Sequence, residues 1–241
     1  MSKLRIALLA ISTILPATAG TIVVPNAYTS TESPSYVNGP FSDAAITFQF
    51  QLAASQFSAV PIGSSLTAIG FRLDSTNTSS GPTAATTYAS YDITLSGSAN
   101  ALGSLSNTFA SNEGPNATSV YDSALVLEPD ALVGGGSINP FYLIQFSTPY
   151  TYSGGDLVVT LSYSAPTGAN VATYTVDGLT SSDGAALLNN SFNAATGTGG
   201  YNFPVTEFVF TSTPEPSTLG LAGLGVIACW MIRRRAIPPR A

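Results

Sequence analysis

Short runs in which apolar and polar residues alternate fill the central part of the sequence. A period of two residues is typical of a β-strand whose two faces meet different surroundings. In the first run the polar residues Thr47, Gln49 and Gln51 are therefore expected on a solvent-exposed face. The clearest runs are AITFQFQLA (45–53), LTAIGFRLD (66–74), YDITLSGS (91–98) and DLVVTLSYS (156–164), with denser runs at FYLIQF (141–146) and VTEFVFT (205–211).

Groups of Gly, Pro, Asn and Ser separate these runs and indicate turns. Asp177-Gly178 and Asp183-Gly184 also suit tight turns. Residues 118–135 contain β-branched residues and a proline, so one or two short strands are expected there rather than a helix. Many short strands joined by turns predict an all-β fold, a single β-sandwich or jelly-roll-like domain over residues 20–212.

Charge and reactive side chains narrow the classes of function. Between Gly20 and Thr213 there are twelve acidic residues and one basic residue, Arg72, which gives a formal charge of −11. A surface of this sign cannot neutralise phosphates, so nucleic acid is excluded as a partner. The chain has no histidine, and Cys229 is its one cysteine, which removes Ser-His-Asp and Cys-His catalysis and typical zinc sites.

Carboxylates and tyrosines remain as candidate site residues. A pair of carboxylates could serve a glycosidase, although the sequence does not choose a pair. Ca²⁺ needs only oxygen ligands, but no calcium-binding motif is present and no metal site is predicted. Tyr91 and Tyr163 fall on alternating strand positions and are expected in the core. Tyr150 and Tyr152, beside Pro149, are better candidates for stacking on a sugar, but packing against the domain is the favoured interpretation there too. The acidic residues considered as calcium ligands are Asp122, Glu128, Asp130, Asp177 and Asp183.

The N-terminal segment 1–19 has the order of a secretory signal peptide. Lys3 and Arg5 form a basic start, an apolar run follows, and Ala17-Thr18-Ala19 is a small-residue cleavage site before Gly20. We therefore expect Ala17, Ala19 and Gly20 to define the signal-peptide cleavage site, and the mature chain to be exported.

The C-terminal segment 213–241 combines three parts. Pro214-Glu215-Pro216 precedes an apolar stretch, residues 217–232, which we expect to be a short transmembrane helix. Arg233, Arg234 and Arg235 follow it and, by the positive-inside rule, place the basic end 233–241 in the cytoplasm and the domain outside.

These three parts resemble the PEP-CTERM sorting signal of exported bacterial proteins. The resemblance implies that Pro214, Glu215 and Pro216 are recognised by an exosortase, a membrane enzyme that removes the tail, so the membrane anchor is transient. It also implies a Gram-negative bacterium that makes exopolysaccharide, with the mature protein at the cell surface or in the extracellular matrix.

The central domain is similar to one that recurs in exported proteins with PEP-CTERM tails. No catalytic activity is implied by this similarity. We therefore expect a non-enzymatic surface or matrix protein without a cofactor, and the alternative is a carbohydrate-binding or carbohydrate-active β-sandwich. The similarity depends on segments in a fixed order: residues 24–27, Glu32, Pro40-Phe41, residues 69–72, residues 93–96, residues 105–110, Asn112 with Gly114, residues 120–125 and residues 148–157.

Overall fold

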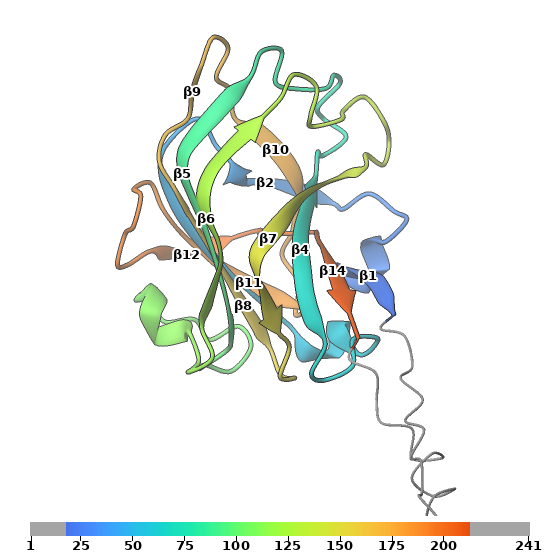
Figure 1. Cartoon of the computed structure of the whole chain (residues 1–241), viewed down its shortest axis with the longest axis vertical. Coiled ribbons are helices and arrows are strands. Elements are labelled where there is room, and N and C mark those ends of the chain that lie inside the picture. The colour runs from blue at the N-terminus through green and yellow to red at the C-terminus, as the bar shows by residue number, and fades with distance from the viewer. Residues whose placement is uncertain (1–17, 213–241) are drawn as a thin grey trace, which may run out of the picture. The chain divides into compact units, whose positions relative to one another are not determined.

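The computed structural model describes residues 18–212, and these residues form an all-β, sandwich-like fold (Figure 1). Within this part of the chain the helices are three short 3₁₀ turns, η1 (Asn26–Tyr28), η2 (Ala54–Phe57) and η3 (Phe109–Asn112). No helix in the described range is long and apolar enough to cross a membrane. The predicted signal peptide, residues 1–19, and the predicted transmembrane helix, residues 217–232, lie outside the described residues. The exceptions are Thr18 and Ala19, and Ala19 is the first residue of the first strand.

The strands form three antiparallel sheets. One sheet has the order β1 (Ala19–Val24), β14 (Thr206–Thr211), β4 (Ser65–Arg72), β7 (Phe141–Thr151). A small sheet contains β13 (Phe203–Pro204), β10 (Tyr174–Leu179) and β2 (Ser35–Phe41). The large sheet has the order β12 (Thr198–Tyr201), β11 (Gly184–Asn189), β3 (Ile46–Leu52), β8 (Leu157–Tyr163), β5 (Thr86–Gly97), β6 (Thr118–Leu127). The short strand β9 (Thr167–Gly168) lies outside this order and pairs with β5.

Aromatic side chains join the sheets in the core. Phe71 of β4 packs edge-on against Phe50 of β3 and Phe41 of β2, with ring centroids 6.5 and 6.0 Å apart. All three rings are fully buried. One phenylalanine therefore contacts residues of both other sheets, and burial of this apolar surface supplies the main stabilisation of a domain with no cysteine.

Three buried tyrosines connect the large sheet to the segment 39–42. Tyr91 and Tyr163 stack with centroids 4.9 Å apart, and Tyr88 packs edge-on against both. Their hydroxyls donate to backbone carbonyls of Pro40, Gly39 and Ser42 respectively. Burial raises the pKa of each of these phenols. Because the hydroxyls are buried and paired, the cluster is structural, as the alternating pattern predicts for Tyr91 and Tyr163.

The predicted strands are confirmed at every run, with ends that differ by a few residues. The segment 118–135 forms one strand, β6, followed by a turn. The predicted turn at Asp177-Gly178 is wrong, since both residues lie inside β10 and pair with Tyr36 and Ser35 of β2. The ladder with β2 and the buried ion pair between Asp177 and Arg72 hold a strand there despite the turn preference of Asp-Gly.

The polar face of β3 is also buried, which corrects the expectation of an exposed one. Gln49 and Gln51 are fully buried beneath the segment 98–116. Gln49 donates to the Phe109 carbonyl and accepts from Asn112 Nδ2, while Gln51 donates to the Asn100 carbonyl. The amides satisfy the irregular backbone that covers them, which is why polar residues are tolerated in the interior.

Candidate functional site

A polar pocket of about 400 Å³ lies on the face of the large sheet that is turned away from the core. Alternate side chains of β3, β8, β5 and β6 line it, and the segments 108–113 and 193–195 contribute the remaining lining. The strand residues that line it carry hydroxyls or carboxylates: Thr47, Thr160, Ser162, Asp92, Thr94, Ser119 and Asp122.

Asp92 and Asp122 form a carboxyl pair in this pocket. They occupy directly opposite positions on β5 and β6, where like charges are unfavourable. Burial raises the pKa of Asp92 to about 6, and the hydrogen bond and negative charge of Asp122 add to the rise. Asp92 Oδ1 is buried and has no hydrogen-bond partner. Asp92 therefore keeps its proton to a higher pH than an isolated aspartate does.

Glu113 supplies a third carboxylate to the lining. Its Oε1 accepts a hydrogen bond of 2.8 Å from Thr160 Oγ1, and Thr160 accepts in turn from Gln49 Nε2. Thr160 lies opposite Thr94, two residues along β5 from Asp92. The buried amide network thus orients the carboxylate of Glu113 on the same face as the pair.

The pocket lining suits hydrogen bonding to a polyhydroxylated molecule. Carboxylates and hydroxyls can accept and donate hydrogen bonds to sugar hydroxyls. Asp92 and Asp122 are direct neighbours across the ladder between β5 and β6. Among the residues lining this pocket the aromatic side chain is Phe109, which is only 4% exposed.

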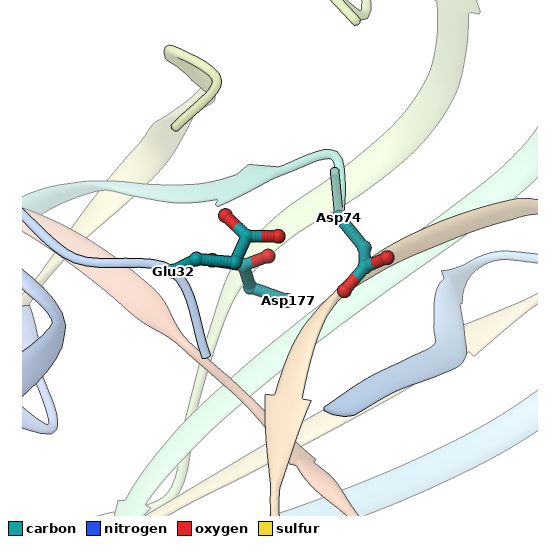
Figure 2. A group of neighbouring side chains, drawn as sticks. All are labelled: Glu32, Asp74 and Asp177. Atoms are coloured by element: carbon teal, nitrogen blue, oxygen red, sulfur yellow. The ribbon is translucent and has the colours of Figure 1, made fainter. Parts of the chain in front are cut away.

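A second carboxyl cluster lies at the opposite side of the core, next to the small sheet. Glu32 precedes β2, Asp74 follows β4, and Asp177 lies in β10, so three separate segments bring these residues together (Figure 2). One carboxylate oxygen from each lies within 4.8 Å of the others.

Arg72 balances part of this charge. Its Nε donates to Asp177 Oδ2 at 2.7 Å, and its Nη2 donates to the Thr31 carbonyl at 2.6 Å. Arg72 and Asp177 are almost completely buried, and the guanidinium lies 5.1 Å from the ring centroid of Phe141. Burial nevertheless raises the pKa of Asp177 to about 7; Arg72 opposes the rise and Glu32 adds to it.

The other acidic residues considered as calcium ligands do not join this cluster. Asp122 belongs to the polar pocket, while Glu128 and Asp130 are exposed in the turn after β6. Asp183 is held in a turn by Ser181 and Gln56. Of the three clustered residues, sequence reasoning considers only Asp177 as a ligand and misses Glu32 and Asp74, which belong to no metal-binding motif.

The two tyrosines considered for stacking on a sugar are buried. Tyr150 is 2% and Tyr152 is 4% exposed. The Tyr150 hydroxyl accepts from Asn116 Nδ2, and Tyr152 packs on Phe57 of η2 and donates to the Gly155 carbonyl. The favoured interpretation, packing against the domain, is confirmed, and these two residues form no exposed platform.

The first and the last strand of the domain lie side by side in one sheet. β1 pairs with β14 in antiparallel register, and Ala19 lies opposite Thr211. Ala19 and Gly20, two residues of the predicted signal cleavage site, are thus the first residues of β1. Pro214, Glu215, Pro216, Arg233, Arg234, Arg235 and Ala17 lie outside the described residues.

Comparison with known families finds a match for one segment of the chain. Residues 212–235 match the family model described as a PEP-CTERM protein-sorting motif, directly after β14. The chain carries a PEP-CTERM sorting motif. The PEP-CTERM motif marks an exported protein with a membrane-anchored precursor that is processed by an exosortase. A search of curated proteins finds no match to the chain.

Proposed function

We propose that this PEP-CTERM protein is a non-enzymatic component of the cell surface or exopolysaccharide matrix of a Gram-negative bacterium. A signal peptide, residues 1–19, directs export, and residues 217–232 hold the precursor in the inner membrane. Exosortase recognises Pro214, Glu215 and Pro216 and releases the β domain with its tail removed. The observation that carries the proposal is the sorting motif at residues 212–235, which begins one residue after the last strand ends at Thr211.

This spacing supports processing without damage to the fold. β14 is complete at Thr211, three residues before Pro214. A cut at or after the PEP residues therefore removes no residue of the sandwich.

The test is the C-terminal mass of the protein in strains with and without the exosortase. We expect a truncated mature form in the first strain and an intact end at Ala241 in the second. Replacement of Pro214, Glu215 and Pro216 by alanine should leave the precursor in the membrane even when the exosortase is present, whereas Ser217→Ala should be processed normally. Surface material that retains residues 233–241 in the exosortase-positive strain would contradict the proposal.

A second candidate function is carbohydrate binding in the polar pocket. The observation that favours it is the set of hydroxyls and carboxyls on one face, with Asp92, Asp122 and Glu113 among them. Titration calorimetry of the full chain against the exopolysaccharide tests it, with Asp122→Asn and Glu113→Gln as variants. Binding that both variants weaken would support this function, and release of reducing ends would indicate a carbohydrate-active domain.

A further inference from the structure

Two buried carboxylate oxygens face the same small space without a partner. Glu32 Oε2 and Asp177 Oδ1 are both inaccessible to solvent and accept no hydrogen bond. Asp177 is fully buried as a residue. Burial of a charged oxygen without a donor is unfavourable, so a positively charged species is needed between these atoms.

Three of the other four carboxylate oxygens accept hydrogen bonds from the protein. Asp177 Oδ2 accepts from Arg72 Nε, and Glu32 Oε1 accepts from the Ser75 amide at 2.6 Å. Asp74 Oδ1 accepts from the Thr76 amide at 2.9 Å. Arg72 and the turn after β4 thus fix the three carboxyl groups, which Figure 2 shows near one another.

The net charge of the cluster and the distances between its oxygens indicate which cation fits the site. Three carboxylates and one guanidinium leave a formal charge of −2, which a divalent cation neutralises and a single proton does not. A spacing of at most 4.8 Å between the ligand atoms is close to what three oxygens at 2.3–2.6 Å from one calcium ion require. Magnesium requires shorter distances and near-ideal octahedral geometry, so these three carboxylates, two of them buried, favour the larger ion.

We propose that Glu32, Asp74 and Asp177 bind one Ca²⁺ ion that ties the start of β2 and the end of β4 to β10. Water completes the coordination, since three carboxylates supply fewer oxygens than the six to eight that Ca²⁺ takes. The ion stabilises the exported domain in an extracellular medium, where calcium sites of about 10⁻⁴–10⁻³ M affinity are filled. Its role is structural, and it is separate from the polar pocket and from the sorting motif.

Titration of CaCl₂ into the full chain, purified in detergent and treated with EDTA, tests the proposal. We expect one Ca²⁺ per chain, and about 10 mM CaCl₂ should raise Tm by roughly 3–10 °C. MgCl₂ at the same concentration should give a much smaller shift. The absence of binding heat and of a Tm shift would overturn the proposal.

Glu32→Gln is the most informative variant, because Glu32 is only partly buried and Gln preserves its size. We expect it to weaken Ca²⁺ binding at least tenfold while its calcium-free Tm stays close to that of the wild type. Asp130→Asn is the matched control, since Asp130 is exposed and Asn tolerates its positive φ of 59°. Equal Ca²⁺ affinity in Glu32→Gln and wild type would place the ion elsewhere and refute the assignment.

Discussion

Asp92 and Asp122 face each other across the ladder between β5 and β6, each the direct cross-strand neighbour of the other. Natural sheets avoid like charges at such positions, so this pair lowers the stability of the domain when both carboxyls are ionised. The pair lines the polar pocket, which is the site of the carbohydrate binding proposed above as a second candidate function.

Asp92→Asn should therefore stabilise the protein at pH 7 but not at pH 4. Burial raises the pKa of Asp92 from 3.8 to about 6, so the stabilising proton is fully bound below pH 3.8 and is lost as the pH rises through about 6. We expect a gain of about 1 kcal/mol in the free energy of unfolding at pH 7, since solvent screens the partly exposed pair. Urea unfolding at both pH values measures it, and an equal effect at pH 4 and pH 7 would contradict it.

Arg72→Met should destabilise the protein by about 3–5 kcal/mol. The substitution leaves the buried carboxylate of Asp177 without the guanidinium that lies 2.7 Å away. Chemical denaturation in EDTA gives the free energy of unfolding. The double variant Arg72→Met, Asp177→Asn should lose less than the single variant, because no uncompensated charge stays buried. A double variant that is less stable than Arg72→Met would show that the charge of Asp177 is not the cause.

Tyr163→Phe should cost about 1–3 kcal/mol, because it leaves two buried backbone groups unsatisfied. The hydroxyl donates to the Gly39 carbonyl at 2.6 Å and accepts from the Ser42 amide at 3.0 Å. Thermal unfolding measures the loss. Tyr36→Phe is the control: Tyr36 is 50% exposed, and its substitution should change stability by less than about 0.5 kcal/mol. Similar effects of the two substitutions would argue against a role for the buried hydroxyl.

Asn112→Ala should loosen the segment 98–116 before it unfolds the domain. The side chain donates to Gln49 Oε1 and the Ser106 carbonyl and accepts from Asn100 Nδ2. Limited digestion with a broad-specificity protease should cut the variant within this segment at least several-fold faster than the wild type. Asn170→Ala, at an exposed position, should be cut at the wild-type rate. An unchanged cleavage rate in Asn112→Ala would mean that other contacts hold the segment.

Much of the fold follows from local pattern, because period-two alternation in β3, β4, β5 and β8 reports which side chains enter the core. What that pattern does not report is how polar faces are covered. Gln49 and Gln51 resemble solvent-facing residues until a segment about 60 residues away supplies their partners. Long-range coverage of this kind leaves no periodic signal in either segment.

The candidate sites differ in the same way: some are continuous in sequence, and others depend on long-range contacts. The sorting motif is continuous in sequence and was therefore predicted directly, as the family match at residues 212–235 confirms. The carboxyl pair and the acidic cluster depend on strand register, which brings together residues 30 and more than 100 positions apart. Asp177 was expected in a turn because Asp-Gly favours one locally, but the register with β2 outweighs that preference.

The position of β14 has a mechanical consequence for a protein sorted through its C-terminus. A pull on the chain beyond Thr211 acts along a strand that has β1 on one side and β4 on the other. The hydrogen bonds that join β14 to β1 and to β4 then share the load, because the force acts along the strand and across both ladders at once. A strand at the edge of a sheet has only one such ladder. A tether that enters the domain through an inner strand can thus bear tension from a membrane or a processing enzyme while the sandwich stays folded.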